Sequence, residues 1–231
     1  MDRPTQRTRR PALALTIVLW WCVGLCLSFG AEQTWQSALA RMPLPSPAPL
    51  LNRDNAVCVL LESFRSNAIV KALAVLPGVS DDFYLVNRDK PKLDLRATNL
   101  LEAIIALTNA TTVRATFRAP FLLLHVDADR LEPLNQIEDS KHADRLKANR
   151  HLAKASYCDT HWDQLQPALQ KAFDRTIRPQ ARSQDAWHFD RHNFAGWSLT
   201  DWEWLEVAAL SGKTRFIVQK QAVTFDLGIG R

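Results

Sequence analysis

The densest group of chemically active side chains lies between Trp187 and Trp197. His188 and His192 are four residues apart, and on a helix this spacing places two imidazoles on one face, where they can bind zinc or another metal ion. The surrounding aromatic residues and the helix start expected at Ser198 instead indicate a strand and a loop, which give no convergent site. We therefore expect a hydrophobic cluster without a cofactor, and a metal site at His188 and His192 is the alternative.

Tryptophan is concentrated in the same region. Each indole buries a large apolar area when it lies inside a protein, whereas a group of exposed indoles marks a surface that contacts a partner. Both interpretations are open, and the possible contact surface consists of Trp187, Trp197, Trp202 and Trp204.

A further set of residues could carry hydrolytic chemistry. The apolar run that begins at Pro120 leads to Asp127 and Asp129, and it looks like the late strand of an α/β-hydrolase that carries the acid of the catalytic triad. His192 would then be the base. The candidate nucleophile, Ser80, lacks the second glycine of a nucleophile turn. An exported hydrolase or metal-dependent enzyme that uses Asp129 and His192 is therefore the alternative function.

Glycine is scarce, with 7 residues in 231, and Gly78 is the only one between Ala31 and Ala195. Phosphate-binding loops and nucleophile turns need several glycines, because the backbone must approach a ligand closely or turn sharply. The sequence contains neither kind of motif, which favours a protein without enzymatic activity.

The first thirty residues are typical of a targeting segment. Four arginines precede an uncharged stretch over residues 11–29, and Ser28 and Gly30 are small residues at the positions that a signal peptidase requires. The same stretch is long enough to remain as a membrane anchor. Residues 1–30 are thus a signal peptide or an anchor, and we expect an exported protein that is periplasmic or anchored in the inner membrane. Membrane contact is expected only through residues 11–29 if they are not cleaved.

The net charge of +5 owes much to this segment. Removal of residues 1–30 takes away four of 29 basic and one of 24 acidic residues, which leaves a net charge of +2. This is too little to indicate a nucleic-acid partner. The most basic stretch runs from Asp139 to Lys154. It is interpreted as the solvated face of a helix, with a patch for an anionic lipid or an acidic partner as the alternative.

Two cysteines, Cys58 and Cys158, lie outside the targeting segment. In an oxidising compartment they can form a disulfide that closes a loop of about a hundred residues and stabilises the fold by roughly 4–5 kcal/mol. Two buried free thiols are the other possibility.

The remaining chain predicts an α+β protein, in which small β-α-β modules pack helices on mixed sheets. We expect a proline-rich spacer over residues 31–50, a first module over 51–135, a helical connector over 136–180 and a second module over 181–231. Two related lobes and a single domain are both compatible with this pattern. The elements that we expect are strands at 56–61, 83–86, 93–95, 113–117, 120–126, 187–189, 215–218 and 222–227, and helices at 69–76, 100–107 and 199–209.

Two stretches share a pattern of capped helix, polar break and strand pair. The first has Asn99 and Glu102 in reciprocal capping positions, and the second has Ser198 and Asp201. This pattern indicates a diverged internal repeat, although any capped amphipathic helix before a hairpin looks similar.

Residues 93–126, and more loosely 188–227, resemble the short N-terminal domain of secretins and TonB-dependent receptors. The resemblance implies small modules of the bacterial cell envelope that bind partner proteins without catalysis. The chain departs from that family because it has no recognisable secretin channel, receptor plug or barrel, and its second helix is longer. We therefore expect a docking or assembly protein with an unidentified envelope partner.

Overall fold

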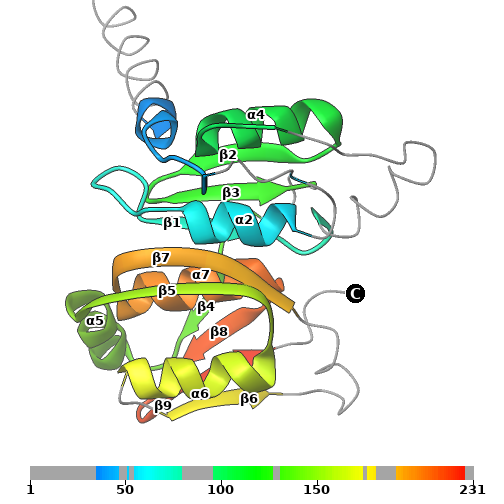
Figure 1. Cartoon of the computed structure of the whole chain (residues 1–231). Coiled ribbons are helices and arrows are strands. Elements are labelled where there is room, and N and C mark those ends of the chain that lie inside the picture. Colours follow the sequence, from blue (N-terminus) through cyan, green and yellow to red (C-terminus); the bar gives the residue numbers. More distant parts are fainter. Residues whose placement is uncertain are drawn as a thin grey trace, which may run out of the picture.

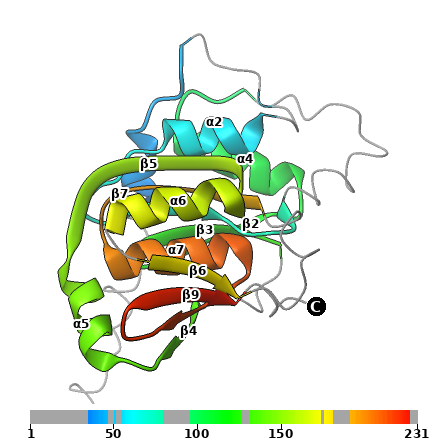
Figure 2. The same ribbon diagram turned by 90° about the horizontal axis from the view of Figure 1, so that it is seen from below.

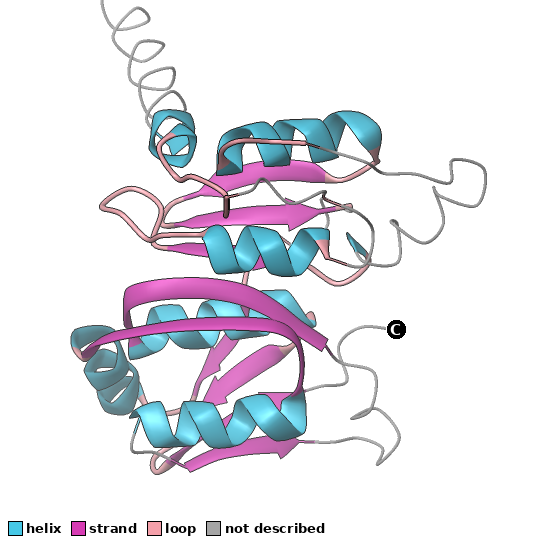
Figure 3. Ribbon diagram, viewed as in Figure 1, coloured by secondary structure: helices cyan, strands magenta, loops and turns pink. Residues whose placement is uncertain are grey.

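The computed structural model describes residues 35–46, 51, 55–79, 96–126, 131–173, 176–180 and 191–226. Helices and mixed parallel and antiparallel strands form an α+β protein, as the sequence predicts (Figures 1 and 3). The expected targeting segment 1–30 and the strands expected at 83–86, 93–95 and 187–189 lie outside the described residues.

A five-stranded sheet has the order β2-β3-β1-β7-β5. β1 is parallel to β3 and antiparallel to β7, whereas the β2-β3 and β5-β7 pairs are antiparallel. The bounds are Ala72–Val75 for β1, Arg114–Arg118 for β2, Phe121–His125 for β3, Arg150–His161 for β5 and Arg191–Thr200 for β7.

A four-stranded sheet has the order β4-β8-β9-β6. β8 and β9 form an antiparallel hairpin, to which β4 and β6 add in parallel on either side. The bounds are Leu134–Ile137 for β4, Thr176–Gln180 for β6, Arg215–Val218 for β8 and Ala222–Asp226 for β9.

The five-stranded sheet is buried on both faces. Phe121 and Leu123 of β3 point into one core, and Leu122 and Leu124 point into another, because successive side chains of a strand alternate between its faces. This explains why residues 120–126 form a continuous apolar run, as expected for a buried strand.

Helix α7, Asp201–Gly212, lies between the two sheets, and α5, Ser140–Ala148, and α6, Trp162–Phe173, complete that core (Figure 2). Helices α2, Ala56–Ser63, and α4, Leu100–Ala110, pack on the opposite face of the five-stranded sheet.

The helix starts test the capping predictions. The Asn99 side chain accepts the Glu102 backbone N–H at 3.0 Å, so α4 begins where the sequence predicts. In α7 the capping residues are Thr200 and Glu203 instead of Ser198 and Asp201, because β7 continues to Thr200 before the helix begins.

Two short apolar segments have the opposite secondary structure to the prediction. The strand expected at 56–61 is helix α2, and the helix expected at 69–76 contains strand β1. Periodicity does not distinguish a short buried helix from a short buried strand. Residues 72–75 form strand β1 because they pair with β3 and β7.

Strand pairing crosses the expected module boundaries. The connector expected at 136–180 contains β5 and β6, and β7 from the expected second module lies between β1 and β5. The spacer expected at 31–50 contributes Trp35, Leu39 and Leu44 to a core. Local sequence patterns do not reveal these arrangements, because strand pairing and core packing join residues that are far apart along the chain.

Within the described residues, each expected repeat contains a helix followed by an antiparallel hairpin, namely α4 with β2-β3 and α7 with β8-β9. The strands that pair in parallel with these hairpins, β1 and β6, lie outside the expected repeats. β1 is followed by α4 and the β2-β3 hairpin, with β3 parallel to β1. Likewise, β6 precedes α7 and the β8-β9 hairpin, with β9 parallel to β6, although β7 is inserted between β6 and α7.

Candidate interaction surface

His192 is part of the core at the start of β7. Its side chain is 0% exposed, and its Nδ1 lies 3.2 Å from the carbonyl oxygen of Ala208 and 3.1 Å from Oγ of Ser211. The ring packs on Trp162, with centroids 5.6 Å apart, and against Gly212. Burial lowers the pKa of His192 to about 4, against an opposing effect of the Ala208 carbonyl.

This environment contradicts the catalytic role considered for His192, because a general base must reach its substrate. Asp129, His188 and Ser80 lie outside the described residues. Within the described ranges, no three His, Cys, Asp or Glu side chains are grouped closely enough to hold a metal ion.

Cys58 of α2 and Cys158 of β5 form a disulfide. The bond confirms the first of the two interpretations of these cysteines. It fastens the helical layer on one face of the five-stranded sheet to β5, the strand at the edge of that sheet.

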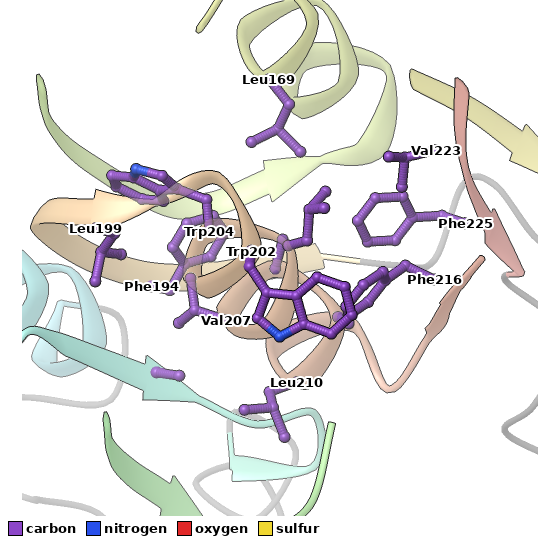
Figure 4. Close-up of a cluster of buried hydrophobic side chains, with 14 of the residues drawn as sticks. Leu169, Phe194, Leu199, Trp202, Trp204, Val207, Leu210, Phe216, Val223 and Phe225 are labelled. Carbon is purple, nitrogen blue, oxygen red and sulfur yellow. The ribbon is translucent and has the colours of Figure 1, made fainter. Parts of the chain in front are cut away.

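Of the four tryptophans in the possible contact surface, Trp187 lies outside the described residues, and the other three separate into two environments. Trp202 and Trp204 are 9% and 4% exposed, and they contact Phe216 and Phe194 in the core between the sheets (Figure 4). The contact-surface interpretation is therefore wrong for both, because α7 is buried on all sides. Trp197 is 48% exposed on β7.

Trp197 borders a small apolar crevice of ≈ 50 Å³, with Phe64, Ala155 and Gly196 among its other lining residues. This volume is far below the roughly 300–1,000 Å³ of a typical small-molecule pocket. The crevice is too small for an organic ligand, so the exposed indole does not define a small-molecule site.

A more open surface begins at β4, the edge strand of the four-stranded sheet. All four of its residues are exposed, including Leu134 and Ile137 at 44% each. Within the described part of the chain, β8 is the only strand that pairs with β4. The Glu138 N–H bonds to the Val218 carbonyl of β8. Because the N–H groups of a strand alternate between its two edges, those of Asn135 and Ile137 point away from β8.

A basic hollow of ≈ 380 Å³ follows directly after β4. It is lined by the N-cap residue of α5 and by residues of α5 and of the β8-β9 turn, namely Asp139, Lys141, His142, Arg145, Lys220 and Gln221. We call this feature the basic hollow. The structure gives no ion pair to its three cationic side chains within the described ranges.

His142 fixes the shape of the basic hollow. It is 5% exposed, and its Nδ1 donates to the Gln219 carbonyl at 2.5 Å, which ties α5 to the β8-β9 turn. The Asp139 side chain accepts the His142 backbone N–H at 3.1 Å and caps α5. Lys220 is thereby held beside Lys141 and Arg145.

The sequence pattern predicted the α5 side of the basic hollow but not the β8-β9 side. The charge pattern identified the basic stretch from Asp139, but Lys220 follows in a turn at a distant position along the chain. No pattern of residue spacing predicts that Lys220 lies beside the basic stretch from Asp139. The parallel pairing of β4 with β8 brings the two together, because it places the ends of both strands side by side.

None of the described helices is long and apolar enough to cross a membrane. Comparison of the chain with known proteins found no matching family model and no significant similarity to a curated protein or to a solved structure.

Proposed function

We propose that this chain is a non-enzymatic, exported protein of the bacterial cell envelope that docks a partner protein along strand β4. An extended segment of the partner would pair with the outward backbone groups of β4. This mode of binding uses main-chain hydrogen bonds for affinity and flanking side chains for specificity.

The exposed edge of β4 is the observation that carries the proposal. Natural proteins protect edge strands, because unpaired N–H and C=O groups invite another chain. β4 has no proline and no charged side chain, and it exposes both Leu134 and Ile137. An edge of this kind is suited to accepting a strand.

Export is supported by two independent features. The basic and then apolar character of residues 1–30 is typical of a signal peptide or an anchor. The Cys58–Cys158 disulfide is typical of proteins that fold in an oxidising compartment such as the periplasm.

Site-specific photo-crosslinking in cells tests the docking role. The full chain carries a photoreactive amino acid in place of Ile137, and the matched control carries it in place of Ile105, which is 48% exposed on α4. We expect a crosslinked partner from position 137 and none from position 105.

Two second-site variants then examine strand pairing itself. Asn135→Pro removes an outward N–H without breaking a bond to β8, because proline is tolerated on a strand edge that faces solvent. Asn135→Ala keeps that N–H. The crosslink should disappear in the first and persist in the second. A crosslink that survives Asn135→Pro, or that forms equally from position 105, would refute docking along β4.

A further inference from the structure

We propose that the basic hollow binds a carboxylate of the docked partner segment, carried by an acidic residue just beyond the stretch that pairs with β4. This inference rests on the proposed function and names the chemistry of the partner.

The hollow lies where a strand added to β4 would leave the sheet. β4 and β8 run in parallel, with Ile137 opposite Val218. Both strands therefore end at the same side of the sheet, where the β8-β9 turn and the start of α5 line the hollow. The N–H groups of Glu138 and Asp139 both bond to the Val218 carbonyl and fix this junction.

The charge of the lining favours an anionic group. Lys141, Arg145 and Lys220 contribute three positive charges, against one carboxylate from Asp139 that already accepts a backbone N–H. A concave surface with an excess of one charge attracts the opposite charge and selects against the same charge. The guanidinium of Arg145 also offers a planar fork of donors that suits a carboxylate.

The lining is held in place before any ligand arrives. The His142 side chain bonds to the Gln219 carbonyl, and the buried Leu146 anchors α5 in the core. Binding then costs little ordering of the backbone, which is the advantage of a preorganised site.

Nearby acidic residues favour a peptide carboxylate over a membrane surface. Glu138 precedes Lys141, Asp144 lies between Lys141 and Arg145, and both acidic residues are exposed. They weaken the attraction of this face to an extended anionic surface, which acts on all charges together. A single carboxylate inside the hollow instead contacts the cationic lining.

Peptide binding to the full chain tests this inference. The chain is held in nanodiscs of neutral phosphatidylcholine. The two fluorescent probes are Thr-Val-Thr-Val-Thr-Glu-Glu and the same peptide ending in Gln-Gln, both amidated at the C-terminus so that only the Glu side chains supply carboxylates. Fluorescence anisotropy measures the Kd of each. We expect the Glu probe to bind about tenfold more tightly than the Gln probe, because charge-assisted hydrogen bonds are stronger than neutral ones.

Charge variants locate the effect. Lys220→Gln and Arg145→Gln should each bring the Kd of the Glu probe to within about threefold of that of the Gln probe. The matched control Lys171→Gln removes an exposed positive charge from α6, outside the hollow, and should keep the preference for the Glu probe.

The outcomes separate this inference from docking. Equal Kd values for the two probes, both weakened by Asn135→Pro, would overturn the carboxylate site and leave docking intact. A Glu preference that depends on Lys220 but is unaffected by Asn135→Pro would support the carboxylate site and count against strand addition. No binding of either probe, or displacement of the Glu probe when phosphatidylglycerol replaces the neutral lipid, would overturn the peptide carboxylate as the occupant.

Discussion

Replacement of His192 by asparagine should remove a specific part of the acid sensitivity of this protein. The imidazole is fully buried, and burial lowers its pKa from 6.5 to about 4. In the unfolded chain the same group is exposed to water and takes up a proton more readily. Between pH 6.5 and pH 4 the unfolded state therefore binds more protons than the folded state, and acid favours unfolding.

The sign and size of the effect follow from this difference. The stability that neutral His192 provides is complete above pH 6.5, declines as the pH falls, and changes no further below pH 4. One pKa unit corresponds to about 1.4 kcal/mol, so the shift from 6.5 to about 4 amounts to about 3 kcal/mol in the free energy of unfolding. The side chain has no solvent exposure, so solvent screening does not reduce this value.

Urea unfolding of the full chain in mild detergent at pH 7.5 and pH 4.5 measures the effect. His192→Asn keeps a side-chain N–H near the Ala208 carbonyl but does not titrate. The variant should be less stable than the wild type at pH 7.5, because the smaller side chain leaves a cavity beside Trp162. Its loss of stability on acidification should be about 2–3 kcal/mol smaller than that of the wild type. Equal losses in the two proteins would refute the argument.

Three further predictions concern the packing of the same fold. Gly212→Ala should lower the free energy of unfolding by about 1–3 kcal/mol, because the added methyl group would collide with the His192 ring; chemical unfolding checks this, and the loss should shrink when His192 is also replaced by alanine. Replacing Cys58 and Cys158 by serine should lower the free energy of unfolding by roughly 4–5 kcal/mol, because the unfolded chain gains entropy. Gel mobility of the wild type with and without reductant detects the disulfide, and chemical unfolding of both proteins measures the loss; unchanged mobility and equal stability would contradict the prediction. Thr200→Ala removes the side-chain cap of α7 and should cost about 1 kcal/mol; a thermal unfolding midpoint identical to that of the wild type would argue against a stabilising cap.

Local signals predicted the elements whose structure is decided locally. Asn99 and Glu102 cap α4 because three residues is the spacing at which a side chain reaches the free N–H groups of a first turn. Ser198 and Asp201 show the same spacing but lie partly within β7, since strand pairing takes precedence over the cap. The strands of the β8-β9 hairpin also form where the sequence predicts, although β9 is buried along its whole length instead of alternating.

The contacts that bury the α7 tryptophans and form the basic hollow are long-range, and local sequence patterns could not predict them. Trp202 and Trp204 follow a pattern that fits a buried stripe or an exposed patch equally well, and only the enclosure of α7 between two sheets decides for burial. The basic hollow depends on Lys220, whose place beside Arg145 follows from the parallel pairing of β4 with β8. Cys58 and Cys158 could be proposed as a pair because no other cysteines lie outside residues 1–30.

The insertion of β7 between β1 and β5 has a consequence for how the polypeptide matures. During synthesis, residues 72–125 emerge long before residues 191–200, so β1 and β3 can associate early while one side of β1 has no neighbour. An incomplete sheet edge of this kind recruits other chains. A product truncated after residue 180 should be prone to aggregate, because β1 would lack its antiparallel neighbour β7.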